Sequence, residues 1–408
     1  MRILYVTPDV GWPLSFGGDI RKWHLLRGVL AAGDADVVVL RRPGRVVHPE
    51  AYAGGRVIHV AEDVRLAPRD EARYASTLGR GWLTVSRAQP YEYLGGPARD
   101  LVARLAARSA YDLVWFANTR AAVLFASGVH TPTVVDGDDF AYVRERQVLH
   151  AEPRYGAKIW NYVNVAKLRR VELSLHRRVS CVLRCSAADA ARHPASRVAV
   201  VPNGTTVPAS IERTPAGRLV FVGDLGYLPN RYGLEWFLAH VWPAVRAEVP
   251  DARLDVIGRH ASDALQRRHG QAGIAVHGFV DALAPCYRDA SAGIVPVHAG
   301  SGTRLKILES LAHAVPVVST SLGAFGLDIS ADAGLTIADA PDAFARACVR
   351  AIRHQADVEP AMRGRAVVAA RYDWTAIEQV VAGVAQRVAA TASRGHAESQ
   401  RQSPEAQP

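Results

Sequence analysis

Apolar runs alternate along the chain with stretches whose apolar residues recur at helical spacing. The first run, residues 2–8, is almost wholly apolar, and a helical pattern over 19–33 follows it and ends at a glycine. Runs that are apolar at nearly every position are typical of strands in a parallel sheet that helices cover on both faces. The first half of the chain is therefore expected to place strands at 2–8, 34–40, 56–61, 111–117, 132–136 and 179–186.

The same pattern begins again after a polar, proline-bearing stretch. A second series of strands is expected at 218–226, 253–259, 274–280, 292–298, 316–320 and 334–339. Two such series predict two doubly wound, Rossmann-like domains, and ligands in folds of this kind bind at the carboxyl ends of the strands. We expect an N-terminal domain over 1–207, a C-terminal domain over 208–373 and, because it lacks apolar residues, a disordered tail over 393–408.

The composition fits a soluble globular protein. Of the 408 residues, 49% are hydrophobic and 22% are charged. No apolar run approaches the ~18 residues of a membrane-spanning helix. The N-terminal apolar run is too short for a signal peptide, so a cytoplasmic location is expected. The four cysteines show no zinc-ligand spacing and are expected to be buried thiols.

The net charge of +10 predicts a surface that attracts anions. Phosphates, nucleic acids and anionic lipids are the usual partners of such a surface. Because no nucleic-acid-binding motif accompanies the charge, a nucleic-acid partner is not expected. The arginine-rich segment 167–178 has two interpretations, a peripheral contact with the inner face of the membrane or a solvated helix face.

Residues 300–309, GSGTRLKILE, begin like an anion-binding loop and continue like a helix. Gly300, Ser301 and Gly302 let the backbone come close to a ligand, and a helix that begins at Thr303 would offer its free N–H groups to a diphosphate. Lys306 and Glu309 would lie on one helix face, with the carboxylate about 10 Å from the phosphate site, at the distance of a ribose. The alternative is an ordinary surface ion pair between these two side chains.

Several blocks of the chain resemble, in the expected order, those of family 4 glycosyltransferases with the GT-B fold: 13–33, 200–204, 219–243, 256–259, 276–280 and 300–327. The resemblance covers roughly residues 1–390. It implies an α/β GT-B fold of two Rossmann-like domains facing across a cleft, with the helix 374–392 returning to the N-terminal domain. It also implies transfer of a sugar from a nucleotide-diphosphate sugar to an acceptor hydroxyl, with retention of configuration and with neither a metal nor another cofactor.

The resemblance assigns roles to individual residues. Glu309 would bind the ribose hydroxyls. Lys306 or Arg304 would neutralise the leaving diphosphate, and Lys306 lies on the better face. Phe279 and Val280 would hold the base. The whole set of donor-binding candidates lies in loops, at strand ends and in the following helices: Gly17, Gly18, Gly223, Asn230, Arg231, Gly258, Arg259, Phe279, Val280, His298, Ser301, Gly302, Thr303, Arg304 and Glu309.

Two positions depart from the pattern of many relatives. Ser301 stands where many have the first of two glutamates, so the contacts to the far hydroxyls of the sugar, and with them the donor sugar, stay open. Asp224 stands where many have a phosphate-binding arginine. Arg231 and Arg259 are the candidates to replace that arginine, and the sequence does not choose between them.

Asp136, Asp138 and Asp139 follow an expected strand. Metal-dependent sugar transferases of the other fold, GT-A, use an Asp-x-Asp pair at such a place to hold a divalent cation. Alternatively, Asp136 and Asp139 cap the following helix. The nucleotide signature lies in the second domain, so no metal is expected here. By alignment Asp138 replaces a histidine that many relatives hold near the reacting sugar carbon, which makes it a catalytic candidate beside Lys306 and Glu309.

Three other functions fit parts of these observations. They are a nucleotide-sugar epimerase of the GT-B fold, a GT-A-like metal enzyme and a non-catalytic assembly subunit. The sequence leaves the acceptor open as a glycan, a lipid-linked molecule or a small molecule, because no transferable pattern occurs over 41–110, where acceptor specificity is expected to reside.

Overall fold

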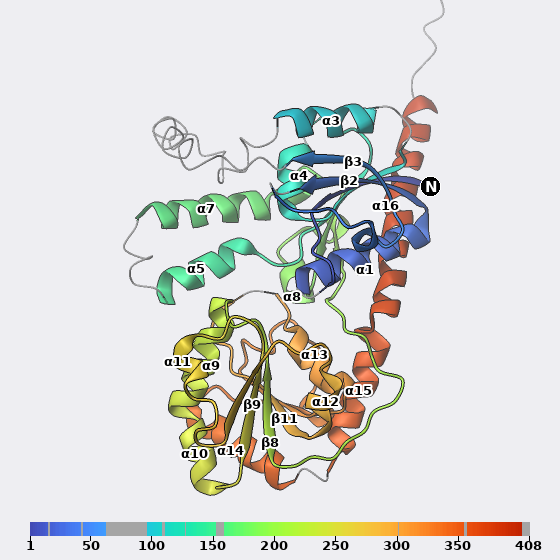
Figure 1. Cartoon of the computed structure of the whole chain (residues 1–408). Coiled ribbons are helices and arrows are strands. Elements are labelled where there is room, and N and C mark those ends of the chain that lie inside the picture. Colours follow the sequence, from blue (N-terminus) through green and yellow to red (C-terminus); the bar gives the residue numbers. More distant parts are fainter. Residues whose placement is uncertain are drawn as a thin grey trace, which may run out of the picture. The chain divides into compact units, whose positions relative to one another are not determined.

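The computed structural model describes residues 1–14, 17–41, 44–62, 96–107, 111–126, 128–151, 159–300, 302–354 and 357–401. The chain forms two compact units. Unit 1 comprises Met1–Pro202 together with the chain from Ile377 onward, and unit 2 comprises Asn203–Ala376. Each unit is built around one parallel sheet with helices packed on it (Figure 1).

The sheet of unit 1 has the strand order β3-β2-β1-β4-β5-β6-β7, and all its neighbouring strands run parallel. Its strands are β1 (Arg2–Pro8), β2 (Asp34–Arg41), β3 (Arg56–Glu62), β4 (Leu113–Phe116), β5 (Thr133–Asp136), β6 (Cys181–Arg184) and β7 (Val198–Val200). The order reverses between β1 and β4, which is the point where ligands bind in doubly wound sheets. Residues Leu113–Phe116 of β4 are fully buried, as the continuous apolar run requires.

The helices of unit 1 include α1 and the C-terminal helix, which pack side by side (Figure 1). A Cβ added to Gly28 of α1 would lie 2.6 Å from Cβ of Val381, so only a glycine permits this approach. In chain order, the described helices of unit 1 are α1 (Gly17–Ala32), η1 (Pro49–Tyr52), α3 (Gly96–Ala107), α4 (Thr119–Phe125), α5 (Ala141–Ala151), α7 (Ile159–Leu173), η3 (Leu175–Arg177), α8 (Ala187–Ala190), η4 (Ala195–Arg197) and α16 (Trp374–Arg401).

The sheet of unit 2 has the order β10-β9-β8-β11-β12-β13 and is also parallel throughout. Its strands are β8 (Arg218–Val222), β9 (Arg253–Ile257), β10 (Ile274–Gly278), β11 (Ala290–Val295), β12 (Val317–Ser319) and β13 (Leu335–Ile337). Its helices are α9 (Leu228–His240), α10 (Trp242–Glu248), α11 (Asp263–Gln266), α12 (Ala284–Arg288), α13 (Leu305–Ala312), η5 (Ala331–Ala333), α14 (Pro341–Arg353) and α15 (Glu359–Arg371). Phe221, Phe237 and Phe344 are fully buried in its largest apolar cluster.

These two parallel sheets confirm the predicted α/β class with two Rossmann-like domains. The units divide between Pro202 and Asn203, earlier than the predicted boundary at 207/208. The reason is that this segment bonds to unit 2: the Thr205 N–H donates to the Tyr372 carbonyl, and the Val207 N–H donates to the Asp373 carboxylate.

The C-terminal helix α16 continues to Arg401, past residue 392, and thus into the segment predicted to be disordered. Residues 393–401 are mostly Ala, Ser, Glu, Gln and Arg. A stretch without apolar residues gives no hydrophobic period to detect, although Ala, Glu, Gln and Arg favour the helical backbone. Residues 402–408 of the predicted tail lie outside the described residues. Within the described part of the chain, no helix is both long enough and apolar enough to cross a membrane.

Candidate functional site

The carboxyl ends of β8 and β9 in unit 2 meet at two glycines. A Cβ added to Gly258 would lie 1.8 Å from the carbonyl oxygen of Gly223, and the φ of Gly258, 152°, is one that other residues rarely adopt. The Gly258 N–H donates to the Gly278 carbonyl over 2.7 Å. Glycines at these two strand ends therefore allow the backbones to approach each other closely.

The side chain of Arg304 supports the loop before α13. Gly300 and Gly302 both have positive φ, 118° and 74°. The buried Arg304 donates from Nη1 to the Gly302 carbonyl over 3.0 Å, and a Cβ on Gly300 would lie 2.7 Å from Arg304 Nη2. Arg304 thus braces the turn. Ser301 lies outside the described residues.

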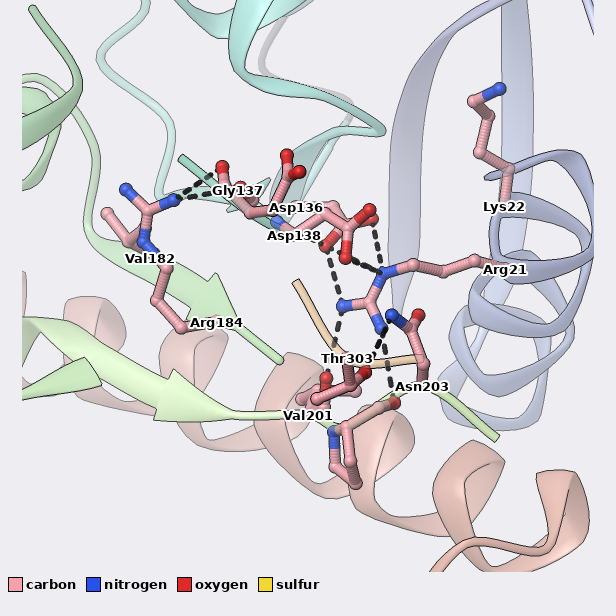
Figure 2. A network of polar contacts seen from close by, with 12 residues as sticks. Arg21, Lys22, Asp136, Gly137, Asp138, Val182, Arg184, Val201, Asn203 and Thr303 are labelled. Carbon is pink, nitrogen blue, oxygen red and sulfur yellow. Dashed lines mark hydrogen bonds and ion pairs between the residues drawn. The ribbon is translucent and has the colours of Figure 1, made fainter. Parts of the chain in front are cut away.

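The helix α13 begins at Leu305, with Arg304 in extended conformation at the N-cap position. The prediction that the helix begins at Thr303 was wrong, because the bends at Gly300 and Gly302 delay the first helical turn. Thr303 instead accepts a hydrogen bond at its hydroxyl from Asn203 Nδ2 over 3.1 Å, and both side chains are buried (Figure 2). Asn203 anchors this loop and was not among the predicted site residues; its only sequence signal was its position in the 200–204 block.

Lys306 projects from the first turn of α13 toward the end of β8. Its amine donates to Asn230 Oδ1 over 2.8 Å and lies 4.4 Å from the centre of the Phe221 ring. Burial, together with the nearby Arg304 guanidinium, lowers the pKa of Lys306 to about 7, against the opposing effect of the Glu309 carboxylate. An ammonium that is desolvated in this way gains most from an incoming anion.

Glu309 lies three residues further along α13 and is half-buried. The pKa of Glu309 is raised, because the effect of burial exceeds the opposing effect of the Lys306 charge. Within the described residues Lys306 and Glu309 form no ion pair, and the Lys306 amine donates to Asn230 instead. Among the described residues no group donates a hydrogen bond to the Glu309 carboxylate. Its two oxygens are therefore available as acceptors for the hydroxyls of a ligand.

Two arginines were candidates to replace the phosphate-binding arginine at position 224. Arg231 lies 3.9 Å from Glu235 of its own helix and over the ring of Tyr232. Arg259 follows β9, with its guanidinium over the ring of Phe279, which is 56% exposed. Arg259 is therefore the better placed at the strand ends, beside the ring to which the family resemblance gives the role of holding the base.

Asp224, at the end of β8, is surrounded by donors. Its carboxylate accepts from His260 Nδ1 over 2.9 Å and from the Gly226 N–H over 2.8 Å, and Arg259 Nη2 lies 4.0 Å away. Burial acts to raise the pKa of Asp224, but the His260 hydrogen bond and the other donors outweigh it and lower the pKa. Asp224 is thus a charged anchor for the loops after β8 and β9.

Two further predicted donor residues pack on their neighbours. Val280 packs against the apolar cluster that contains Ile257 and Tyr287. The His298 ring lies edge-on to Trp236 of α9, with 4.3 Å between the ring centroids, and burial lowers the pKa of His298. Val280 thus contributes to an apolar cluster, whereas His298 stays exposed beside Trp236.

Unit 1 holds a buried ion pair between α1 and the end of β5 (Figure 2). Arg21, which is 2% exposed, donates from Nε and Nη2 to both carboxylate oxygens of Asp136 over 2.8–3.2 Å. Its Nη1 and Nη2 also donate to the carbonyls of Pro202 and Val201, each over 3.1 Å. Arg21 thus ties together α1, β5 and the chain beyond β7, and it was absent from the predicted site residues.

Asp138 is held near this pair in a left-handed backbone conformation, with φ of 35°. Its N–H donates to Asp136 Oδ1 over 3.3 Å, and its Oδ1 lies 3.7 Å from Arg21 Nε. The side chain is 40% exposed. Asp138 therefore presents a carboxylate to solvent beyond the carboxyl end of β5, oriented by buried neighbours.

The first two N–H groups of α5 take their acceptor from α7 rather than from the aspartates that the sequence offered as caps. The N–H groups of Ala141 and Tyr142, at the start of α5, donate to the carboxylate of Glu172 over 3.0 and 3.1 Å. Burial raises the pKa of Glu172 to about 7. Within the described ranges, no group of three or more His, Cys, Asp or Glu side chains converges as a metal ligand set would.

The double glycine of the sequence lies at the start of α1, which begins at Gly17 and Gly18. In the first turn, Asp19 Oδ2 accepts from the Gly11 N–H over 3.1 Å, and Asp19 Oδ1 accepts from Lys22 Nζ over 2.7 Å. The loop after β1 is thereby fastened to the helix. Residues 15 and 16, in the part of this loop just before α1, lie outside the described residues.

The fold and these strand-end sites define a two-domain α/β protein of the GT-B class. Solved structures of this class match nearly the whole chain. Alr3699/HepE of Anabaena, in complex with UDP, is 15% identical with a TM-score of 0.64 over 94% of this chain and 99% of that one. Sucrose-phosphate synthase from Thermosynechococcus elongatus is 17% identical with a TM-score of 0.67 over 96% and 99%.

The family match lies within unit 2. Residues 216–354 match the family "Glycosyl transferases group 1". An uncharacterised 44.6 kDa protein in the cps region of Klebsiella pneumoniae is 31% identical over 137 residues, which are 31% of this chain and 35% of that protein. The chain thus matches about a third of the length of this curated relative. The matched segment carries Gly223, Asn230, Arg259, Lys306 and Glu309.

Proposed function

We propose that this protein is a glycosyltransferase that moves a sugar from a nucleotide-diphosphate sugar to an acceptor hydroxyl. One observation carries the proposal: on one face of α13, behind a two-glycine loop, lie a desolvated lysine amine and a glutamate carboxylate to which no described residue donates a hydrogen bond. A cation for the diphosphate and an acceptor for the ribose hydroxyls are what a nucleotide diphosphate requires. The match of 216–354 to a glycosyltransferase family supports the same reading.

In the proposed reaction the bond between the anomeric carbon and the diphosphate breaks, a bond to the acceptor oxygen forms, and the acceptor loses its proton. Lys306 and the positive N-terminal end of α13 stabilise the charge that develops on the departing diphosphate. Glu309 fixes the ribose. Phe279 and Val280 hold the base, and Arg259 takes the place of the phosphate-binding arginine. Asp138, in unit 1, accepts or orients the acceptor's hydroxyl proton.

The finer assignments rest on the resemblance to family 4. They are retention of configuration, independence from metal ions, and a glycan, lipid-linked or small-molecule acceptor. The cytoplasm, with a peripheral contact to the inner face of the membrane, is the proposed location. UDP is the first donor probe, since the Anabaena structure was determined with UDP.

The test measures binding of a panel of nucleotide diphosphates and nucleotide-sugars, with and without a divalent metal or a chelator. Thermal shift screens the panel, and calorimetry then gives the affinities. We expect a nucleotide diphosphate to stabilise the wild-type protein and Glu309→Ala to weaken that binding at least about tenfold, the loss of a charge-assisted contact worth ~1.5–3 kcal/mol. The matched control is Glu359→Ala, on the exposed face of α15, which should bind like wild type.

Three outcomes would contradict parts of the proposal. Unchanged affinity in Glu309→Ala would remove the ribose assignment. Loss of binding in chelator would indicate a metal-dependent enzyme. Conversion of a nucleotide-sugar to an isomer without an acceptor would indicate an epimerase.

A further inference from the structure

Asn230, in the first turn of α9, joins two groups of the candidate donor site. Its side chain is 9% exposed, and its Nδ2 donates to the Asp224 carbonyl over 2.9 Å. That bond fixes the orientation of the amide, so that Oδ1 faces the Lys306 amine at 2.8 Å. Since an ammonium can only donate, it requires an oxygen at this place, and the amide satisfies both neighbours in one orientation.

The space around these groups is set by the absence of a side chain at Gly223. A Cβ there would lie 2.8 Å from Asn230 Nδ2 and 2.9 Å from Lys306 Nζ. Asn230 and Lys306 therefore meet directly over the end of β8. A larger residue at 223 would displace one or both of them.

Among the described residues, the charged groups that face Lys306 come from α13 and from the N-cap residue before it. Arg304 repels the ammonium, and Glu309 attracts it from the next turn. The two other elements packed against the amine contribute neutral groups, the Phe221 ring from β8 and the Asn230 amide from α9. No carboxylate accepts a hydrogen bond from the amine in the described part of the chain.

We propose that Asn230 is a positioning residue, which holds the Lys306 amine at the diphosphate site through a neutral acceptor and leaves its charge to be balanced by the ligand. The inference rests on the proposed function of this site. A carboxylate at the same place would balance the charge before the ligand arrives and would repel the diphosphate. The neutral partner therefore couples binding to the protonation of Lys306.

This coupling has a definite sign. In the protein without ligand the pKa of Lys306 is about 7. This pKa rises when a diphosphate binds, because an opposite charge favours the ammonium. Above pH 7 binding must then take up a proton, and the Kd should rise with pH by up to about tenfold per unit. The terminal phosphate is fully ionised above pH 7.5, since its last pKa is near ~6, so it contributes no slope there.

The experiment measures the Kd of UDP by calorimetry at pH 7.5, 8.2 and 9.0, with GDP and ADP as alternative probes should UDP fail to bind. The variants are Asn230→Asp and Asn230→Ala. The control is Asn161→Asp, which makes the same charge change on α7 of the other unit. In wild type and in the control we expect the Kd to rise roughly tenfold from pH 7.5 to 9.0.

In Asn230→Asp the new carboxylate should keep Lys306 protonated. The Kd at pH 7.5 should then be at least about tenfold weaker than in wild type, and it should be flat with pH. Asn230→Ala should bind several-fold more weakly and keep the pH slope. A merely structural role would lower the melting temperature without changing the slope.

Two results distinguish a failure of the proposed function from a failure of this inference. If UDP, GDP and ADP all fail to bind the wild-type protein, the proposed function is contradicted, and this inference falls with it. If a diphosphate binds but Asn230→Asp keeps the slope of the Asn161→Asp control, the inference alone is overturned.

Discussion

At the scale of single residues, Lys306 and Glu309 show how local spacing carries chemical information. Both side chains lie on one face of α13 because they are three positions apart in a helix. The sequence could predict that relation, since it depends on the helix alone. It could not predict that Asn230, 76 positions away, would accept the lysine's hydrogen bond. That contact depends on the distance between α9 and α13 above the sheet.

Gly258 offers a residue-scale test of the strand-end geometry. Gly258→Ala places a Cβ 1.8 Å from the Gly223 carbonyl oxygen and at a φ of 152°. The ends of β8 and β9 would have to separate, so we expect the free energy of unfolding of unit 2 to fall by more than about 2 kcal/mol in urea titration.

The control for this variant is Gly270→Ala, also in unit 2. Gly270 has a positive φ of 78° but open space around its Cα, so it reports the backbone strain without the collision. A loss of about 1 kcal/mol is expected there. Equal losses of unfolding free energy in the two variants would show that the close approach of Gly258 to Gly223 does not require a glycine.

At the scale of elements, the buried pair of Arg21 and Asp136 joins α1 to β5. The two residues are 115 positions apart, and each is nearly fully buried. Sequence patterns identified Asp136 as one of three acids after a strand but could not predict its partner. Strand order decides it, because the neighbouring positions of β1, β4 and β5 bring α1 over the end of β5.

Asp136→Asn should destabilise unit 1 strongly. The amide would leave the Arg21 guanidinium buried without its counter-charge, a change that typically costs about 3–5 kcal/mol. Chemical denaturation monitored by circular dichroism measures this loss.

The exposed i,i+4 pair of Glu359 and Arg363 supplies the matched control. Glu359→Gln makes the same carboxylate-to-amide change at the surface, where an ion pair contributes less than about 0.5 kcal/mol. Similar losses for the two variants would mean that the Arg21 pair is not a structural link.

At the scale of the whole molecule, unit 1 is completed by chain from the far end of the sequence. Unit 1 takes residues from Ile377 onward, and Ile377, Val381 and Val384 of α16 are buried. Val381 packs against Gly28, and the neighbouring His24 and Glu378 bond over 2.6 Å. The C-terminal helix is therefore part of the core of unit 1.

Val381→Asp tests this closure. It introduces a carboxylate at a fully buried position and should destabilise unit 1 by several kcal/mol. Val380→Asp, one residue earlier and 44% exposed, should change stability by less than about 0.5 kcal/mol.

Because the candidate donor residues Gly223 to Glu309 lie in unit 2, UDP binding should survive in both variants. Calorimetry measures UDP binding, and thermal denaturation measures the stability of unit 1. Loss of UDP binding in Val381→Asp together with an unchanged unit 1 would contradict the division into units.

The sequence by itself determined most of the strands and the two-domain architecture. Continuous apolar runs predicted the strands, and β1 at Arg2–Pro8 agrees with the run at 2–8, because hydrophobic periodicity reports the local backbone. It also placed a lysine and a glutamate on one helix face. Tertiary structure alone decided which groups meet: Asn230 with Lys306, Arg21 with Asp136, and Asn203 with Thr303, 100 positions apart. Such contacts depend on strand order and register, which no local pattern contains.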